Sequence, residues 1–415
     1  MIAAGGLAQV ESRAASASDT VSLALIGARN QGRGVALRSI AAGARISVLC
    51  DIDDGIAAKV SPEIERAQGS PPAYVKDFRR VLDRKDVDAV IIAAPDHWHT
   101  HMAIPACQAG KDVFLEKPVS QTVREGQLIR DAARKYARVM QIGTMRRSAD
   151  HFRAAAEFVG SGKLGKICLI KAWMCQVRRS IGNPPDGAPP EGADYDMWLG
   201  PAPQRPFNPN RFHYNWRFFW DYGNSELGNQ GVHMLDVALW GIQKMRRAEK
   251  CLPTRVSGQG GIYWLDDAKE VPDTQVVTYD FGEFMLVWEL RSFSSGNAIE
   301  GTEAGTAFYG TEGTLTVDGS GWRVQSIKGE PGPSAGRAPF QHERDFLDCV
   351  KSRQKPNADI EVGRLSTTLC HLGNIAHHLK RDVRFDPATE TFPGDGEANA
   401  LLTKSYRASY PLPAV

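Results

Sequence analysis

The first part of the chain alternates continuous apolar runs with stretches of helical periodicity. Short apolar runs that each end at a turn residue are typical of strands buried on both faces of a parallel sheet. The predicted strands cover residues 21–26, 45–50, 87–93, 113–115 and 139–142. Helices are predicted between them, over residues 35–42, a polar stretch ending at 67, 103–109 and 123–136. This alternation predicts an α/β domain with a doubly wound parallel sheet over residues 21–145.

After about residue 146 the pattern changes. A stretch rich in proline, glycine and aspartate predicts a loop over residues 182–209. Strand-like runs then follow without helices between them, over residues 255–264, 275–280, 284–293, 298–309 and 314–317. Two helices are predicted at 342–351 and 364–379. Residues 146–385 are therefore expected to form a second α/β domain with a large open, mostly antiparallel sheet, and residues 386–415 a C-terminal tail on the surface.

Composition narrows the class of partner. Lys and Arg number 50 and Asp and Glu 48, and a net charge of +2 does not favour nucleic acid as a partner. No apolar run approaches the roughly 18–20 residues of a membrane span, so no membrane partner is expected. The seven cysteines are scattered and form no CxxC pair, which argues against a disulfide framework and against structural zinc.

Residues 1–20 are small and polar after a short apolar opening. A secretory signal needs a basic start and a longer apolar core, and neither is present. The segment is predicted to be a flexible arm, and the protein cytoplasmic. The alternative is a signal remnant, which would mean export to the periplasm.

A glycine-containing turn, GARNQG, separates the first predicted strand from the first predicted helix. Glycines allow backbone to approach a pyrophosphate, and a helix N-terminus favours its negative charge. Asp51 ends the next strand, close to the spacing expected for the acid that binds the adenosine ribose hydroxyls. Together these features predict an NAD site, because a carboxylate repels the 2′-phosphate of NADP. NADP is the alternative. The expected contact residues in the turn are Gly27, Asn30, Gln31 and Gly32.

Two further predicted strands end in polar residues, beyond which ligands of open α/β sheets bind. The expected cofactor-pocket residues at these ends are Pro95, Asp96, His99, Glu116 and Lys117. His97, His99 and His101 stand at alternate positions, but no carboxylate or thiolate with metal-site spacing accompanies them. We therefore expect no metal. A buried lysine has a lowered pKa and can donate a hydrogen bond or move a proton, which makes Lys117 a catalytic candidate.

The stretch GNQGVHMLD at 228–236 leads into an amphipathic helix. His233 and Asp236 are three residues apart, so both can face one side, and Asn229 lies one turn earlier. A histidine can take a proton from an alcohol as hydride leaves, so His233 and Asp236 are catalytic candidates and Asn229 a substrate-binding one. The alternative is a core histidine capped by Asp236.

An aromatic and arginine-rich stretch covers residues 210–224. Sugar rings stack on aromatic faces, and sugar hydroxyls need several donors and acceptors. The expected substrate contacts here are Trp216, Arg217 and Tyr222. An arm that packs at a protein interface is the competing interpretation.

With these residues the chain resembles the glucose–fructose oxidoreductase and inositol dehydrogenase (Gfo/Idh/MocA) family over about residues 21–385. The resemblance rests on the glycine turn, Asp51, DAVIIAAPDHWH, the EKP motif at 116–118, GVHMLDVALW at 231–240 and FYGTEGTL at 308–315. It implies an N-terminal Rossmann domain, a nicotinamide cofactor and a C-terminal sheet that mediates homo-oligomers, dimers or tetramers.

The resemblance also implies residue roles. Lys117 matches the family's catalytic lysine and His233 its catalytic histidine, while Glu116 and His99 match cofactor-pocket positions. Two positions depart from the family pattern. Arg29 replaces the middle glycine of the turn, and Asn229 stands where well-studied members often carry an aspartate.

The sequence thus predicts an NAD(P)-dependent dehydrogenase that transfers hydride between nicotinamide and a hydroxyl-bearing carbon of a sugar, glycoside or cyclitol. One alternative is a glycosidase that uses bound NAD for transient oxidation and elimination. Another is a non-catalytic NAD-binding protein.

Overall fold

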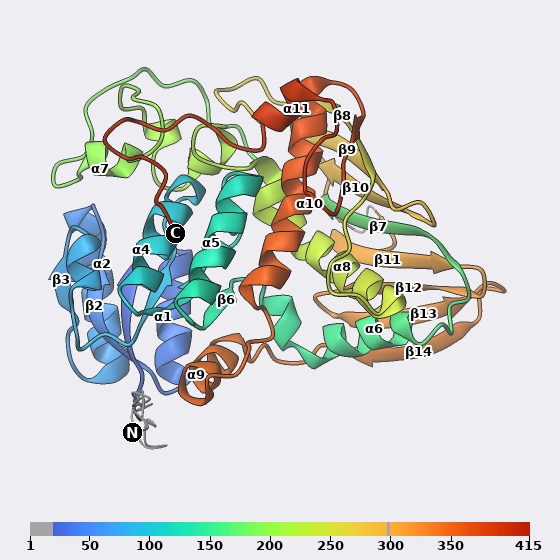
Figure 1. Cartoon of the computed structure of the whole chain (residues 1–415), viewed down its shortest axis with the longest axis horizontal. Helices are drawn as coiled ribbons and strands as arrows, with labels where there is room; N and C mark the ends of the chain where they lie inside the picture. The colour runs from blue at the N-terminus through green and yellow to red at the C-terminus, as the bar shows by residue number, and fades with distance from the viewer. Residues whose placement is uncertain (1–19, 297–298) are drawn as a thin grey trace, which may run out of the picture.

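The computed structural model describes residues 20–296 and 299–415. The predicted arm or signal remnant lies outside this part of the chain, apart from residue 20. A parallel sheet and a larger mixed sheet stand at opposite ends of the molecule, and helix α10 (Ile360–Leu379) runs between them (Figure 1). Within the described ranges no helix combines the length and the apolar character that a bilayer span requires.

The first sheet has the strand order β3-β2-β1-β4-β5-β6. Every pairing in it is parallel, which confirms the predicted doubly wound sheet. The strands are β1 (Ser22–Ile26), β2 (Arg45–Cys50), β3 (Ala73–Val75), β4 (Ala89–Ile92), β5 (Asp112–Leu115) and β6 (Met140–Ile142). Strand β3 was not predicted, because its apolar run AYV is only three residues long and is largely exposed.

Helices cover both faces of this sheet, which is why β4 and β5 are apolar at nearly every position and fully buried. One face packs on α4 (His99–Gln108) and α5 (Val123–Lys135). The other packs on α1 (Gln31–Ala41), α2 (Asp54–Gln68) and α9 (His342–Ser352). Helix α3 (Arg79–Leu82) is a single turn. Helix α9 comes from the second half of the chain, so both halves build this core.

The second sheet has nine strands in the order β14-β13-β12-β11-β7-β10-β9-β8-β15. All neighbours are antiparallel except β7 and β10, so the predicted mostly antiparallel sheet is confirmed. The strands are β7 (Ile167–Cys175), β8 (Arg255–Gly261), β9 (Thr274–Asp280), β10 (Met285–Arg291), β11 (Ala304–Gly310), β12 (Gly313–Asp318), β13 (Gly321–Ser326), β14 (Pro331–Gly336) and β15 (Val383–Arg384).

Helices α6 (Asp150–Gly160), α8 (Val232–Arg246) and α10 lie on one face of this sheet and bury the largest apolar cluster. On the opposite face Val276 and Met285 are exposed. Strand β7, at the centre of the sheet, and helix α6 were not predicted from the sequence. Neither were β13 and β14, whose residues are mostly polar or glycine.

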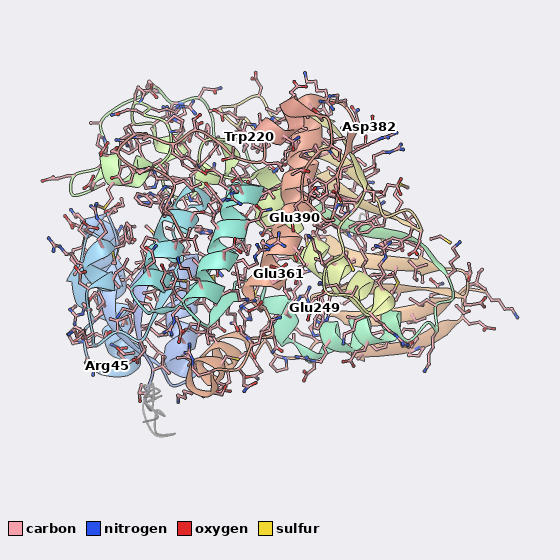
Figure 2. The ribbon with its side chains drawn as sticks, viewed as in Figure 1. Arg45, Trp220, Glu249, Glu361, Asp382 and Glu390 are labelled. Carbon is pink, nitrogen blue, oxygen red and sulfur yellow. The ribbon has the colours of Figure 1, made fainter. Side chains whose placement is uncertain are left out.

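Helix α10 is held at the centre by a buried ion-pair cluster. Arg364, almost fully buried, donates to Glu361 on the same helix (2.7 Å) and to Glu390 (2.6 Å). Glu390 lies in the segment after β15, and both carboxylates stand beside α10 in Figure 2. The pairs fix the chain after β15 against the helix that separates the two sheets.

After α11 (Gly396–Ala400) the tail runs back across the first domain and ends beside α4 (Figure 1). Leu402 O accepts from Arg124 N on α5 (3.0 Å), and Tyr406 Oη donates to Glu125 Oε1 (2.8 Å). Nearer the end, the Tyr410 ring packs edge-on against Trp98, with the centroids 5.4 Å apart. Residues 402–415 therefore cover the α4–α5 face of the parallel sheet.

Candidate active site

Two adjoining pockets lie beyond the carboxyl ends of the parallel strands, where ligands of such sheets bind. The Asp51 pocket is lined by the ends of β1 and β2 and by side chains from residues 197–216. The Lys117 pocket is lined by the end of β5 and by the start of α8. Ala93, Ala94 and Trp216 line both pockets, so one ligand can extend through the two.

The glycine turn between β1 and α1 leaves no room for a side chain at Gly27 or at Gly32. Gly27 has a φ of 84°, and a Cβ there would lie 2.8 Å from the backbone of Ala93. A Cβ on Gly32 would lie 1.9 Å from Gly27 O. Helix α1 starts without a side-chain cap, whereas Asp53 caps α2 and Thr122 caps α5. Gly32 N donates to Arg29 O (3.0 Å), whereas the N–H groups of Gln31 and Arg33 have no backbone partner among the described residues and remain available to an anion.

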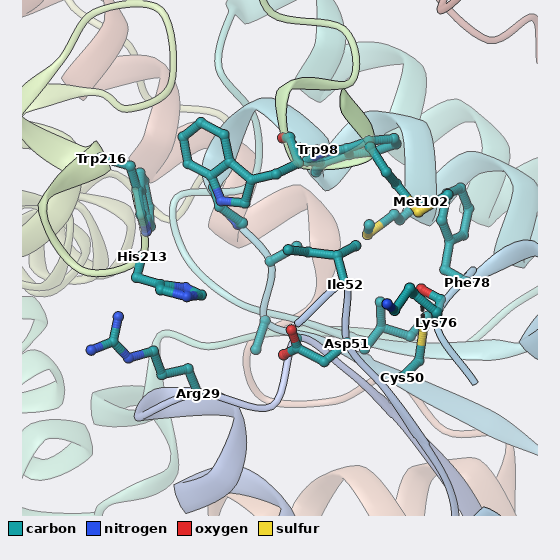
Figure 3. Close-up of a pocket in the computed structure, with 17 residues that line it drawn as sticks. Arg29, Cys50, Asp51, Ile52, Lys76, Phe78, Trp98, Met102, His213 and Trp216 are labelled. Carbon is teal, nitrogen blue, oxygen red and sulfur yellow. Dashed lines mark hydrogen bonds between the residues drawn. The ribbon is translucent and has the colours of Figure 1, made fainter. Parts of the chain in front are cut away.

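Asp51 holds the position at the end of β2 that the sequence predicts. Its carboxylate accepts from Ala28 N (2.8 Å) and from Asp53 N (3.0 Å). Burial raises the pKa of Asp51 to about 6, although these N–H groups favour the charged form. In Figure 3 Asp51 lies between a side formed by Arg29, His213 and Trp216 and an apolar side that includes Phe78. The pocket thus combines one carboxylate with apolar and aromatic side chains and with the cations Arg29 and Lys76.

Residues 182–222, here called the cover segment, close over the Asp51 pocket. The segment contains α7 (Tyr195–Leu199) and docks on the turn after β2, where Asp194 N donates to Ile52 O (2.9 Å). His213 Nε2 donates to Asp53 Oδ2 (2.8 Å). Trp198 O accepts from Trp98 Nε1 (2.9 Å). A ligand beside Asp51 would therefore touch both halves of the chain.

The Glu116–Lys117 pair is buried at the end of β5. Gln31 Nε2 donates to Glu116 Oε1 (2.8 Å), and Gly143 is required nearby because a Cβ there would lie 2.6 Å from Glu116 Oε2. Burial raises the pKa of Glu116 and lowers that of Lys117, and each charge partly offsets the effect on the other. The lysine is thus held in a poorly solvated position that faces the pocket.

Lys117 is the end of a chain of polar contacts. Its Nζ donates to Asn229 O (2.8 Å) and contacts Asn229 Oδ1 (3.3 Å). Asn229 Nδ2 donates to Glu226 Oε2 (3.1 Å), and Glu226 is paired with Arg178 (2.8 Å). An ammonium group has three donors. Two face Asn229, which leaves one for a ligand in the pocket.

His233 and Asp96 also line the Lys117 pocket. Burial lowers the pKa of His233 well below its ordinary value, and the nearby charges of Lys117 and Arg146 act in the same direction. Its Nδ1 is buried and has no hydrogen-bond partner among the described residues. Asp96 accepts from Asn224 Nδ2 (2.9 Å), and burial raises its pKa to about 7. A neutral imidazole therefore faces the pocket at neutral pH.

Some predicted site residues lie elsewhere. Asp236 is fully buried and accepts from Arg147 Nε (3.0 Å) and Ser366 Oγ (2.6 Å), so its carboxylate is engaged away from His233. Tyr222 is buried in an aromatic cluster with Trp198, 4.8 Å between centroids. Both would have to leave these contacts to reach a substrate.

The other predicted site residues line one of the two pockets or lie directly behind the residues that do. Gly27, Asp51 and Pro95 line the Asp51 pocket, and Trp216 lines both. The Lys117 pocket is lined by Gln31, Asp96, Glu116, Lys117, Arg217, Asn229 and His233. Asn30 and Gly32 shape the turn behind them. His99 contacts Pro118 O (2.7 Å) and Ala94 O (3.0 Å), so it links two strand ends.

Sequence reasoning missed three groups in or beside the pockets. Arg146 follows β6 closely, so the strand-end argument that selected Asp96 and Lys117 applies to it as well. Glu226 and Arg178 act through Asn229, and no sequence pattern joins residues so far apart. His213 lies in the cover segment, whose path cannot be predicted from its composition.

Two family models match the chain. Residues 8–144 match "Oxidoreductase family, NAD-binding Rossmann fold", and residues 182–412 match "Oxidoreductase family, C-terminal alpha/beta domain" of the same GFO_IDH_MocA group. The second match alone covers more than half of the chain.

Curated relatives match over shorter stretches. An inositol 2-dehydrogenase of Saccharopolyspora erythraea is 29% identical over 150 residues, 36% of this chain and 42% of that protein. A glycosyl hydrolase family 109 protein of a Shewanella species is 38% identical over 112 residues, 26% of this chain and 25% of that protein. The chain thus spans less than half the length of these relatives.

Solved structures match over most of the chain. A levoglucosan dehydrogenase in complex with NADH and levoglucosan has a TM-score of 0.67 and 18% sequence identity. The match covers 88% of this chain and 99% of that one. At this identity the likeness establishes the shared two-domain fold.

Proposed function

Because the chain belongs to the GFO_IDH_MocA oxidoreductase family, with its NAD-binding Rossmann domain, we propose that it transfers hydride between NAD and a hydroxyl-bearing carbon of a carbohydrate. The observation that carries this proposal is the Lys117 pocket. A buried lysine with one free donor and a neutral buried histidine line the same cavity, next to the carboxylate of Asp51.

The residues present fit an extended dinucleotide. The crowded glycines and the uncapped start of α1 suit a pyrophosphate, and the Asp51 carboxylate suits ribose hydroxyls. Trp216 and the other shared residues lead from there into the Lys117 pocket. When bound there, the nicotinamide ring would supply the hydride acceptor or donor.

Lys117 and His233 would then divide the work on one substrate oxygen. The third N–H of Lys117 would donate to that oxygen and stabilise the negative charge that develops on it. His233 is neutral because its pKa is lowered, so it can take the hydroxyl proton at neutral pH. Asn229 holds the lysine, and Trp216 and Arg217 supply an aromatic face and donors for the sugar.

The test is a panel of sugars, glycosides and cyclitols with NAD, followed by NADH absorbance. General acid–base groups contribute about 10²–10⁴-fold in rate, so Lys117→Ala and His233→Ala should each lower kcat by that order. NAD affinity, measured by calorimetry, should change much less. Wild-type turnover in both variants would contradict the proposed roles and return His233 to a core-histidine role.

A redox-neutral glycosidase is a second candidate, favoured by the likeness to the family 109 protein and by the cover segment over the Asp51 pocket. Such an enzyme would oxidise, eliminate and reduce again without releasing its cofactor. Stoichiometric NADH supports a dehydrogenase, whereas free sugar released from a glycoside without net NADH supports the glycosidase. NAD binding without either product would indicate a non-catalytic protein.

A further inference from the structure

Three cations face the Lys117 pocket without an ion pair. Lys117, Arg146 and Arg217 all line it, and none has a carboxylate oxygen within 4.0 Å among the described residues. By contrast, Arg147 and Arg178 just outside the pocket are each paired with a carboxylate. Unpaired cations at the wall of a buried pocket are costly, so their presence together points to an anion that binds there.

Arg146 is the most isolated of the three. Its Nη1 is buried and has no hydrogen-bond partner in the described part of the chain. Its guanidinium lies 5.2 Å from the centroid of the Phe152 ring, an aromatic face that orients it without using its donors. Burial lowers the pKa of Arg146 to about 10, so the group stays charged at neutral pH.

Arg217 reaches the same pocket from the cover segment. Its Nε donates to Tyr214 O (2.9 Å), and its guanidinium stacks on the Tyr214 ring (4.0 Å) and lies 5.5 Å from the Trp216 ring. These contacts fix the plane of the guanidinium and leave its Nη groups for a ligand. A planar fork held in this way suits carboxylate or phosphate oxygens.

The acids that line the pocket, Glu116 and Asp96, act on Lys117 only from beyond ion-pair distance and offset the three cations in part. Glu116 is bonded to Gln31, and Asp96 is bonded to Asn224. Burial raises the pKa of Asp96 to about 7, so this carboxyl is partly uncharged near neutrality. The oxidised nicotinamide ring would add a further positive charge. The pocket therefore has an excess of positive charge, which an anionic substrate would balance.

We propose that the substrate is an anionic carbohydrate, whose carboxylate or phosphate is bound by Arg146 and Arg217 while its reacting hydroxyl meets Lys117 and His233. The inference rests on the proposed function, because it assigns a substrate class to the same pocket. A neutral sugar would leave the two forks without charged acceptors.

The test compares matched sets of sugars with NAD: glucose, glucuronate and glucose phosphate, and the corresponding galactose and mannose sets. We expect the anionic member of at least one set to exceed its neutral partner about tenfold or more in kcat/KM, the factor typical of a charge-assisted hydrogen bond. The uronate and phosphate arms identify which anion is preferred. Higher kcat/KM for the neutral sugar in every set that reacts would overturn the inference and leave the proposed function standing.

Variants separate substrate charge from cofactor binding. Arg146→Gln should raise KM for the anionic sugar about tenfold or more and leave KM for its neutral partner within about twofold. Arg217→Gln should raise KM for both sugars, and more for the anionic one, because Arg217 also supplies donors to the sugar. Arg146→Lys should keep part of the preference because the charge remains. The control is Arg124→Gln, an exposed α5 residue whose side chain donates to Gln127 Oε1 (3.3 Å). If the arginine variants weaken NAD binding instead, the cations serve the cofactor and the inference is wrong.

If no sugar is oxidised, the proposed function fails. The binding of sugars to the protein then tests the anion site independently of catalysis. Calorimetry on the NADH-loaded protein would compare glucuronate and glucose phosphate with glucose. Tighter binding of an anionic sugar that is lost in Arg146→Gln supports the anion site. Equal or absent binding of all three overturns it.

Discussion

Asn229 lies between two groups of opposite charge, and its amide suits both. The oxygen faces the Lys117 ammonium, and the nitrogen donates to the Glu226 carboxylate. An aspartate here would serve the lysine but would place a second carboxylate beside Glu226. These two neighbours therefore explain the asparagine. The nearby negative charge is carried by Glu226, which is paired with Arg178.

We predict that Asn229→Asp lowers kcat about 10–100-fold, because Glu226 loses the amide donor and the two adjacent carboxylates share a proton, which changes the charge beside Lys117. The double variant Glu226→Gln with Asn229→Asp exchanges amide and carboxylate and keeps the net charge. It should recover most of the activity and the wild-type pH profile of kcat. If the loss of kcat in the double variant equals the combined losses of Glu226→Gln and Asn229→Asp, the proposed coupling between these two residues is wrong.

Asp51 gives NAD binding a dependence on pH. Burial raises its pKa to about 6, so the carboxylate is charged above that pH and protonated below it. The charged form is the better acceptor for ribose hydroxyls, so affinity should fall as pH drops, about tenfold from pH 7 to pH 5. Asp51→Asn should bind more weakly and remain flat over this range. Calorimetry across that interval checks the prediction, and a wild type whose affinity is independent of pH refutes it.

Much of the candidate site could be predicted because its residues stand at strand ends. Asp51, Asp96 and Lys117 each follow a buried apolar run, and the parallel topology brings such ends together. The spacing of Asp236 from His233 was misleading. Helical spacing says which side chains share a face, but Arg147 and Ser366 come from other elements and engage the carboxylate.

At the scale of elements, α8 packs on the large sheet with very little clearance. Gly241 faces the Phe308 ring of β11, and a Cβ there would lie 2.4 Å from a ring carbon. Met234, Val237 and Ala238 share this side of α8 by helical spacing and are buried as well. Because α8 begins at the residues that line the Lys117 pocket, this packing also fixes where His233 stands.

We expect Gly241→Ala to lower the free energy of unfolding by about 1–3 kcal/mol, because the ring of Phe308 must move. Gly34→Ala in α1 is the matched control. A Cβ there meets only the flexible end of Arg38, so the change should stabilise by about 0.5–1 kcal/mol through helix propensity. Chemical denaturation of the two variants measures both values. If both variants change the free energy of unfolding equally, helix propensity outweighs the packing of Gly241 against Phe308.

Element prediction succeeded where burial and sequence pattern agree. The strands of the parallel sheet are buried on both faces and appear as apolar runs. Strands β13 and β14 lie at the edge of the large sheet, and β14 is exposed throughout. Such strands are defined by their hydrogen bonds to neighbours, which leave no hydrophobic pattern in the sequence.

At the scale of the whole molecule, helices cover one face of the large sheet, and the other face is covered only in part, where Trp173 packs with Ile299. Elsewhere on this second face Val276 is 41% and Met285 43% exposed. Sheets with an uncovered apolar face commonly pack against another surface. We therefore expect two copies of the chain to associate through this face.

Val276→Lys should shift the assembly toward monomer, because an ammonium group at the interface would have to be desolvated. In register it stands opposite Glu289, so the sheet itself should tolerate the change to within about 0.5 kcal/mol. Analytical ultracentrifugation measures the shift, and thermal unfolding checks the fold. A wild type that is monomeric at all concentrations would contradict the expectation.

The return of residues 402–415 to α4 and α5 has a consequence for how the protein is made. Domains begin to fold as they leave the ribosome, at roughly 5–20 residues per second. The parallel sheet and helices α1 to α5 emerge first, and the segment that covers α4 and α5 follows about tens of seconds later. During that interval Trp98 lacks its Tyr410 neighbour, and an apolar patch of the nascent chain stays open to the chaperones that bind such surfaces.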